Sequence, residues 1–261
     1  MTKARQRALL FLLVAAIAVA ATALVLARQK IATPSKRPTL LLLTSLPLIF
    51  NEQFALSGGG SPALKVLQDH YRVVPISVAS VGDLAKGRLV VMAQPPAQTA
   101  ENLVALDDWV RGGGQVLLFA DPLLEWPSRR PLGDPLRPPP MFADTGLLAH
   151  WGLRLDSPED RGPAFRNLAG QKVLTVSPGA LYGGCTISPD RLVADCRLAR
   201  GRALVVADAD LLDVADLGPD ASNNLTAVIR LLASVANRRF AESQTYPQDR
   251  PARTGEEQAH L

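Results

Sequence analysis

Residues 91–121 read VMAQPPAQTAENLVALDDWVRGGGQVLLFAD, and this stretch predicts a strand, a helix and a second strand in succession. After the first apolar run, Thr99 stands where its hydroxyl can cap a helix. Three apolar residues of that helix would face a sheet together, namely Leu103, Leu106 and Val110. The glycines at 112–114 end the helix, because glycine adopts the left-handed conformation at low cost. The run at 115–120 is the second strand, and such short connections predict a right-handed parallel crossover.

Three more apolar runs have the length of buried strands. They are residues 39–44, 72–78 and 202–207, and the first strand of the opening stretch extends over 88–93. Further helices are predicted from amphipathic spacing, at residues 61–71, 144–151 and 223–237. Residues 153–200 read as short strands and turns. The predicted fold class is therefore α/β, flavodoxin-like or Rossmann-like, with a mainly parallel five-strand sheet, helices on both faces and a small β-rich insertion at about 153–200.

Residues 8–27 are a run of 20 residues without a charge, long enough to span a bilayer as a helix. The basic residues before this run favour a cytoplasmic N-terminus. A cleavable signal peptide is the rival interpretation, because Ala21, Thr22 and Ala23 fit a cleavage site, but the apolar run is longer than usual for one. A buried soluble helix is the third alternative.

The chain is therefore divided into five segments. They are a cytoplasmic N-terminus at 1–7, a transmembrane anchor at 8–27, a linker at 28–38, the α/β domain at 39–240 and a polar, disordered tail at 241–261. The predicted localisation is the inner membrane, with a single span and the main domain in the periplasm.

The net charge of +4 comes mostly from the basic residues that precede the apolar run. Without Lys3, Arg5 and Arg7, the chain has 25 basic against 24 acidic residues. It also lacks a basic run with interleaved aromatic residues, so no nucleic-acid partner is expected.

The two cysteines, Cys185 and Cys196, flank a turn signal at residues 188–190. Two short strands folded over that turn would bring them together in a disulfide, which an oxidising compartment permits. The alternative is a pair of reduced, partly buried thiols. Two cysteines and three scattered histidines form no metal-binding pattern, so neither a metal nor a cofactor is predicted.

In α/β folds of this kind, ligands bind beyond the carboxyl ends of the strands. The residues at those positions are Ser45, Gln94, Asp121, Asp208 and Asp210. The aspartates can cap turns through hydrogen bonds to the backbone. Alternatively, they can bind a cation or act as general acid and base. Ser45 and Gln94 could contact a small ligand.

Catalytic motifs are missing around these positions. Ser45 lacks the G-x-S-x-G pattern of a nucleophile elbow. The glycines before Ser61 lack the lysine of a phosphate-binding loop. The glycines at 112–114 stand at a helix C-terminus, where the helix dipole repels anions. The predicted site is therefore non-catalytic.

Several stretches of the chain resemble the GldG-like auxiliary proteins of ABC-type export systems. The resembling stretches are RLVVMAQPPAQTAENLVALDDWVRGGGQVLLFADP, TGLLAHWGLRL, ALVVADADLL and NNLTAVIRLLASVAN. The residues that fit the family pattern are Leu106, Asp107, Trp109, Val110, Gly113, Gly114, Asp121, Pro122, Trp151, Gly152, Asp208, Asp210 and Asn224. The resemblance implies a glutamine-amidotransferase-like fold without catalytic machinery, in a membrane-tethered subunit of an ABC permease and ATPase. The second membrane span of longer family members has no counterpart here.

The leading functional hypothesis is a non-catalytic, membrane-anchored binding or scaffolding domain that assists an ABC-type exporter. One alternative is a hydrolase or carbohydrate-acting enzyme that uses Asp121, Asp208 or Asp210. The other is a sensor domain for a small ligand near Ser45 and Gln94. The sequence leaves the ligand and the oligomeric state open.

Overall fold

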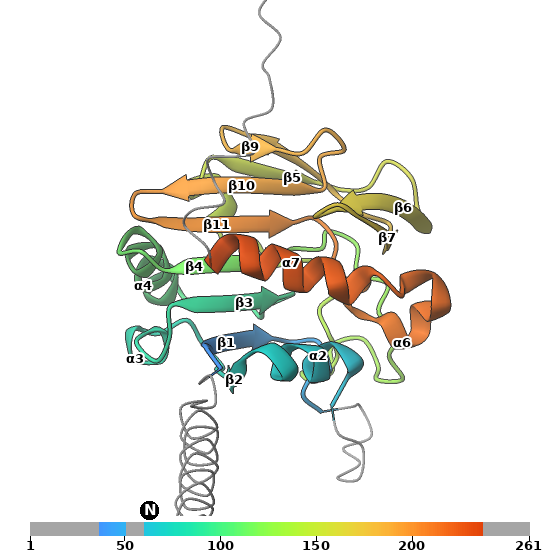
Figure 1. The fold of residues 1–261 in the computed structure, drawn as a ribbon, viewed down its shortest axis with the longest axis horizontal. Helices are drawn as coiled ribbons and strands as arrows, with labels where there is room; N and C mark the ends of the chain where they lie inside the picture. The colour runs from blue at the N-terminus through green and yellow to red at the C-terminus, as the bar shows by residue number, and fades with distance from the viewer. Residues whose placement is uncertain (1–36, 51–59, 237–261) are drawn as a thin grey trace, which may run out of the picture. The chain divides into compact units, whose positions relative to one another are not determined.

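The computed structural model describes residues 37–50 and 60–236. The chain divides into two compact units, 1–38 and 39–261, and the fold described below is that of the second unit. Its centre is a seven-stranded sheet with the strand order β2-β1-β3-β4-β11-β10-β9, which Figure 1 shows edge to edge.

The strands of the main sheet are β1 (Thr39–Thr44), β2 (Arg72–Pro75), β3 (Leu89–Ala93), β4 (Gln115–Phe119), β9 (Thr186–Ile187), β10 (Val193–Leu198) and β11 (Gly201–Val206). The first four and β11 run parallel to one another. Two smaller antiparallel sheets accompany it. One pairs β5 (Leu153–Asp156) with β8 (Ala180–Gly183), and the other is the hairpin of β6 (Pro163–Leu168) and β7 (Gln171–Val176).

The helices are α2 (Pro62–His70), α3 (Val81–Leu84), α4 (Ala100–Arg111), α5 (Leu147–His150), α6 (Val214–Leu217) and α7 (Asn224–Ala236), with 3-10 turns η1 (Asp210–Leu212) and η2 (Gly218–Ala221). The apolar side chains of the sheet alternate between two cores, as expected of buried strands with helices on both faces. The first core contains Leu40, Leu67 and Leu232, under α2 and α7. The second contains Leu41 and Leu106, under α4. In Figure 1, α2 and α7 cross the near face of the sheet.

The predicted fold class was wrong, because the sheet is a mixed sheet of seven strands rather than a mainly parallel sheet of five. All five predicted strands form, but β10 and β9 extend the sheet with antiparallel pairing. The predicted separate insertion of small strands and turns at about 153–200 left β10 out of the sheet. Only two residues, Ala199 and Arg200, separate β10 from β11, and this tight hairpin adds β10 to the sheet edge.

The predicted inner-membrane localisation is not upheld by the described structure. Within residues 37–50 and 60–236, no helix is both long and apolar enough to cross a bilayer. The segment 8–27, on which that prediction rested, lies outside the described residues, as does the tail at 241–261.

The crossover from β3 through α4 to β4 has the predicted form. The Thr99 hydroxyl accepts a hydrogen bond from the Asn102 amide, 3.4 Å away, at the start of α4. At its end, Gly113 adopts a φ of 110°, in the left-handed region that favours glycine. The β10–β11 hairpin then packs against this end of the helix, since the Arg200 amide donates to the Arg111 carbonyl over 3.2 Å.

Gly201→Ala should destabilise the protein at this contact. A Cβ atom at residue 201 would lie 1.9 Å from the Val110 carbonyl oxygen and 2.5 Å from that of Gly114. Both are backbone atoms that cannot rotate away. We expect a loss of about 2–3 kcal/mol in the free energy of unfolding, the upper part of the overpacking range, and thus a Tm roughly 5–10 °C lower in a thermal scan.

The matched control is Gly184→Ala, where an added Cβ meets nothing within 4 Å. This variant should remain within about 0.5 kcal/mol of the wild type. Equal melting temperatures for the two variants would show that the close approach at Gly201 is not a real constraint.

Candidate functional site

The five residues predicted at the strand ends lie at one end of the sheet and are linked to one another. Ser45 follows β1, and its hydroxyl donates to the carbonyl of Gln94, which follows β3. The Gln94 side chain bonds to the backbone of Asp121, after β4. Asp121 in turn accepts from the amide of Ala209, between Asp208 and Asp210. The structure therefore brings the predicted residues together.

Gln94 is fully buried and has a positive φ of 42°, which is uncommon for a residue other than glycine. Its side-chain oxygen accepts from the Asp121 amide over 3.0 Å, and its nitrogen donates to the Asp121 carbonyl over 3.2 Å. The nitrogen also reaches the Pro139 carbonyl at 3.3 Å. An amide side chain is neither a nucleophile nor a base. The Gln94 side chain, in this turn after β3, therefore holds the segment that follows β4 and presents no reactive atom.

Asp121 and Asp208 use both carboxylate oxygens on backbone amides. Asp121 accepts from Leu123 at 2.9 Å and from Ala209 at 2.7 Å. Asp208 accepts from Val176 at 2.8 Å and from Leu211 at 2.7 Å. One bond of each residue is local, within three positions, and the other joins a segment distant in sequence.

Asp210 connects the strand end to the loop after β4. Its Oδ2 accepts from the Glu125 amide over 2.8 Å. The Glu125 carboxylate in turn accepts from the hydroxyl of Ser177, and the same hydroxyl accepts from the Gly162 amide. Loop 122–142 and hairpin β6–β7 are thus tied to each other as well as to the sheet.

Asn224, at the start of α7, is a bracing residue that the sequence analysis did not propose as a site. It is fully buried. Its Oδ1 accepts from the Leu174 amide at 2.9 Å, and its Nδ2 donates to the Leu174 and Leu211 carbonyls at 2.8 and 2.9 Å. Its place at the head of a helix was visible in the sequence, but its partner 50 residues away was not. Glu125 and Ser177 were missed for the same reason.

The carboxylates at the strand ends have raised pKa values. Burial raises the pKa of Asp121 to about 6, with Glu125 adding repulsion, against hydrogen bonds that lower it. Burial and then the charge of Asp121 raise the pKa of Asp208 well above its usual range. Burial, followed by the charges of Asp121 and Glu125, raises the pKa of Asp210 to about 7. Raised values like these occur in catalytic sites and in structural networks alike.

No grouping of histidine, cysteine or acidic residues in the described ranges is arranged to hold a metal ion. Two surface grooves lie elsewhere, along β6 and the turn at 188–192, and neither is lined by any of the five strand-end residues. The strand-end carboxylates therefore bond to backbone amides, and the two grooves are lined by other residues.

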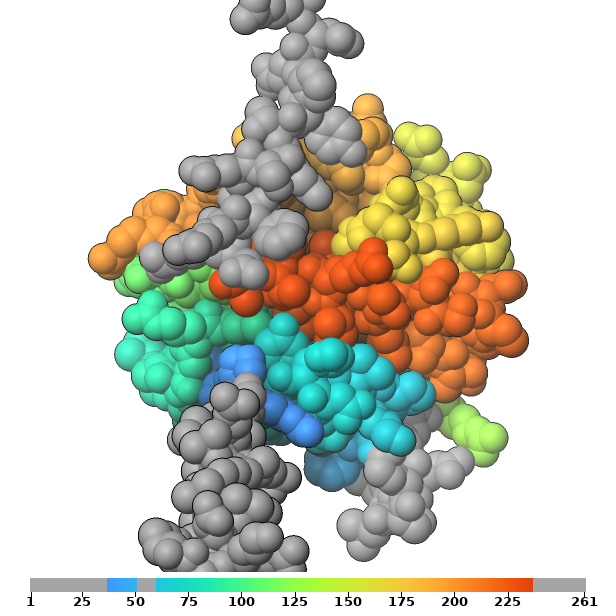
Figure 2. All heavy atoms as spheres, viewed as in Figure 1, coloured from blue at the N-terminus to red at the C-terminus, as the bar shows by residue number. Residues whose placement is uncertain are grey.

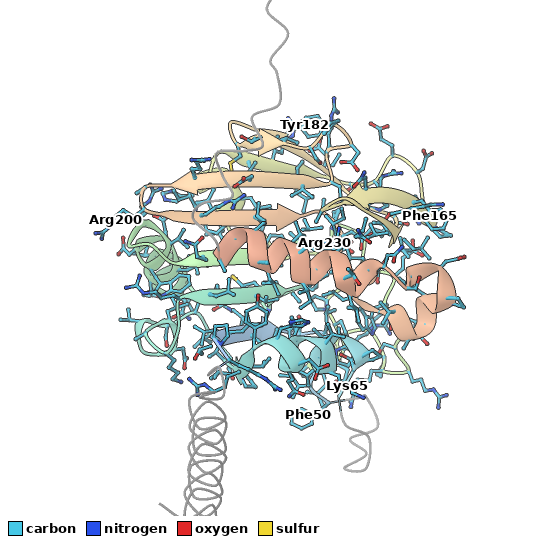
Figure 3. All side chains as sticks on the ribbon, in the orientation of Figure 1. Phe50, Lys65, Phe165, Tyr182, Arg200 and Arg230 are labelled. Atoms are coloured by element: carbon cyan, nitrogen blue, oxygen red, sulfur yellow. A yellow bond between two sulfur atoms is a disulfide. The ribbon has the colours of Figure 1, made fainter. Side chains whose placement is uncertain are left out.

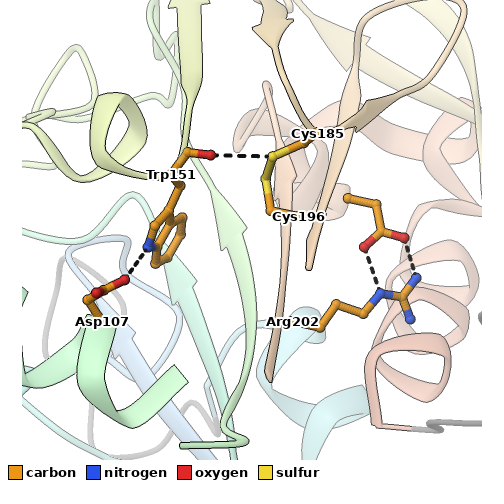
Figure 4. The surroundings of a disulfide bond; sticks show 6 residues. Asp107, Trp151, Cys185, Cys196 and Arg202 are labelled. Atoms are coloured by element: carbon orange, nitrogen blue, oxygen red, sulfur yellow. Dashed lines mark hydrogen bonds and ion pairs between the residues drawn. A yellow bond between two sulfur atoms is a disulfide. The ribbon is translucent and has the colours of Figure 1, made fainter. Parts of the chain in front are cut away.

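Cys185 and Cys196 form a disulfide, with a Cα–Cα distance of 4.8 Å (Figure 4). The β9–β10 ladder pairs Ile187 with Ala194 and Thr186 with Asp195, so the disulfide occupies the next position of that register. Beside it, the Trp151 carbonyl lies 3.5 Å from the Cys185 sulfur. The disulfide thus fixes the outer edge of the main sheet and stands apart from the strand ends.

No family model matches the chain, and no curated protein matches it. Among solved structures, it is similar to the exo-β-1,4-mannosidase Op5Man5 from Opitutaceae bacterium strain TAV5, with 14% identity, 80% of this chain and 37% of that chain covered, and a TM-score of 0.47. A cytoplasmic protein from Salmonella typhimurium matches with 10% identity, 75% and 98% coverage and a TM-score of 0.45. A putative ThuA-like protein from Bacteroides uniformis ATCC 8492 matches with 10% identity, 77% and 94% coverage and a TM-score of 0.45.

Glycoside hydrolases are thus among the structural neighbours at low identity, and the chain spans little more than a third of the mannosidase. At these TM-scores the likeness transfers no activity. None of the three is described as an exporter auxiliary protein. The resemblance to GldG-like proteins and the partnership with a permease and ATPase stay predictions that these comparisons do not test.

Asp210→Asn tests the electrostatics of the strand ends. Because the folded pKa is about 7 and the ordinary value is 3.8, the folded state keeps a proton that the unfolded state loses in this range. The free energy of unfolding should therefore fall as the pH rises from about 4 to about 7, by at most about 1.4 kcal/mol per pH unit for this group. Asparagine retains the acceptor for the Glu125 amide, so the variant should show a shallower fall.

The measurement is urea unfolding of wild type and variant at pH 4, 5, 6, 7 and 8. The exposed Asp69→Asn is the control, and its pH dependence should match the wild type. A wild-type slope in the Asp210 variant would contradict the assigned pKa.

Proposed function

We propose that this chain is a non-catalytic binding domain, in which the residues at the strand ends brace two surface elements. These elements are loop 122–142 and hairpin β6–β7. The observation that carries the proposal is the use of the strand-end side chains. The carboxylates of Asp121 and Asp208, and the amides of Gln94 and Asn224, bond to backbone groups of strand β7 and of the segments that follow β4 and β11.

A catalytic carboxylate must reach a substrate atom, at hydrogen-bonding distance or through one water molecule. Asp121 and Asp208 are fully buried, and each of their oxygens accepts from a backbone amide. Removing these bonds to serve a substrate would leave buried amides unpaired, at about 1–3 kcal/mol each. This arrangement supports a structural role for the carboxylates.

Loop 122–142 supports the binding role, because it holds apolar side chains in solvent on an ordered frame. Asp134 accepts from the Leu136 amide at 2.8 Å and pairs with Arg130 at 3.3 Å. On this frame Leu132 is 77% exposed, Leu136 56% and Met141 60%. These three apolar side chains are therefore available on one loop to contact another molecule.

The hydrolase alternative draws on one observation, the raised pKa values of Asp121 and Asp210, which would suit a general acid near neutral pH. The two proposals differ in a direct assay. We expect the purified protein to release no more nitrophenol than a buffer blank from a panel of 4-nitrophenyl glycosides and esters between pH 5 and 8. Asp210→Asn should behave identically.

Turnover by the wild type that is lost in a folded Asp210→Asn protein would overturn the proposal in favour of the enzyme. Circular dichroism and thermal unfolding of the variant establish that it is folded. The Asp69→Asn protein serves as the control, because a contaminating hydrolase would give equal rates in all three preparations.

A further inference from the structure

The two edges of hairpin β6–β7 differ in how their backbone groups are paired. On the β7 side, Asn224 bonds to both the N–H and the C=O of Leu174, and Asp208 accepts from the N–H of Val176. These groups therefore point away from β6. Side chains of α7 and of the β11 end thus occupy the place that a further strand would take beside β7.

The opposite edge follows from the register. Phe165 is the partner of Leu174, and Asn167 is the partner of Lys172. In an antiparallel pair, residues that face each other turn their backbone groups the same way, either both inward or both outward. The N–H and C=O of Leu174 point away from β6, so the N–H and C=O of its partner Phe165 point away from β7. The backbone groups of Asn167, two residues farther along β6, point the same way as those of Phe165. In the described ranges, the one hydrogen bond to these outward backbone groups is from Arg166 Nη1 to the Phe165 carbonyl, at 3.3 Å.

This edge lies at the molecular surface beside a hollow. Figure 3 shows Phe165 at the rim of the molecule, and its side chain is 46% exposed. The hairpin is visible in yellow in the space-filling view of Figure 2. A shallow depression of about 680 Å³ is lined by Phe165, Arg166, Asn167, Lys172 and Asp190. A second groove of about 590 Å³ shares Arg166 and Asp190 with it.

We propose that the outer edge of β6 binds an extended peptide carrying acidic side chains, which adds to the hairpin as a third strand. The proposal rests on the assignment of the chain as a binding domain and names the partner of that domain. The outward N–H groups of Phe165 and Asn167 and the outward C=O of Asn167 supply the backbone hydrogen bonds of strand addition, whereas the Phe165 carbonyl already accepts from Arg166. The partly exposed Phe165 ring, over which Lys172 Nζ lies 3.9 Å from the centroid, supplies apolar contact for a neighbouring side chain.

Charge at the edge favours acidic side chains in the peptide. Two cationic groups, Arg166 and Lys172, flank the strand. The nearby Asp190 carboxylate already accepts from the Ser188 hydroxyl at 2.6 Å and from the Leu192 amide at 3.3 Å. Farther along the groove, charges of both signs are present, so the preference is set at the edge itself.

A second copy of this chain fits the edge less well. Antiparallel pairing of two β6 strands about Arg166 would place two arginines directly opposite each other, which is destabilising. Pairing about Phe165 would place Asn167 opposite Pro163, which has no N–H to donate. A separate peptide has neither restriction.

The hairpin is held in place before any peptide binds. Asn224 and Asp208 fix β7, and the two-residue loop at Ala169 and Gly170 has the positive φ values, 50° and 71°, of a tight hairpin turn. A rigid edge loses little conformational entropy on binding.

The test uses a fluorescein-labelled octapeptide of alternating glutamate and valine, titrated with the full-length protein and followed by fluorescence anisotropy. The key pair of variants is Asn167→Pro and Asn167→Ala. Proline removes the outward N–H, and the ladder to β7 does not use that group. Alanine keeps it. We expect Asn167→Pro to weaken binding at least about tenfold, as for one lost hydrogen bond with its partner left unpaired, and Asn167→Ala to stay within about twofold.

Hydrogen exchange supplies a second readout, because the amides of Phe165 and Asn167 should become protected when the peptide is bound. If Asn167→Pro unfolds, a probe with alternate N-methylated residues replaces it and should bind at least about tenfold more weakly than the parent. A lysine–valine peptide should bind more weakly than the glutamate one. Failure of the glutamate peptide to bind, equal affinities for the proline and alanine variants, or preference for the lysine peptide would each overturn the proposal.

None of these outcomes depends on the nitrophenol assay. If the protein neither binds the peptide nor hydrolyses the substrates, only the proposal of peptide binding at the β6 edge is overturned. If the protein hydrolyses the substrates and the folded Asp210→Asn variant does not, the proposal of a non-catalytic binding domain is overturned.

Discussion

Pairing the backbone amides that leave the buried end of the sheet is the constraint on which the rest of this structure depends. Loops after parallel strands carry N–H groups that water cannot reach, and each unpaired group costs about 1–3 kcal/mol. Here Asp121 closes the gap between the segments after β4 and β11, and Asp208 joins β11 to hairpin β6–β7. The loop after β4 and the hairpin therefore have defined positions despite their irregular or isolated character.

The use of carboxylates for this purpose has an electrostatic cost. Several acidic groups are buried within one small region, and burial followed by mutual repulsion raises their pKa values. An ionised carboxylate has two oxygens, so it can accept a hydrogen bond from a backbone amide on each of them. The side chain of asparagine or glutamine has only one acceptor oxygen. The backbone amides thus gain hydrogen-bond acceptors, and the repulsion between the buried carboxylates is the energetic cost. The raised pKa values of these carboxylates follow from their burial as partners of backbone amides, and by themselves they are no evidence of catalysis.

The sequence specifies the local parts of this architecture well and the distant ones poorly. The run at Thr39–Thr44 and the crossover through α4 were predictable, because apolar periodicity, a capping threonine and terminal glycines act over a few residues. Asp121 was recognised as a turn-capping residue, and its bond to Leu123 is of that kind. Its bond to Ala209 spans 88 residues and depends on the finished sheet. The place of β10 in the sheet also depends on its pairing with β11, which the pattern of residues 193–198 does not reveal.

The Cys185–Cys196 disulfide has a consequence for how the molecule behaves among its own copies. Any sheet with an accessible border can grow by recruiting strands from other molecules. At one border of the main sheet, β2 ends in Pro75, which cannot donate a ladder bond. At the other, β9 has two residues and is cross-linked to β10 at the next position of the register. Both borders are therefore poor templates for the addition of strands from other molecules. At one of them, the disulfide holds the short edge strand covalently in place.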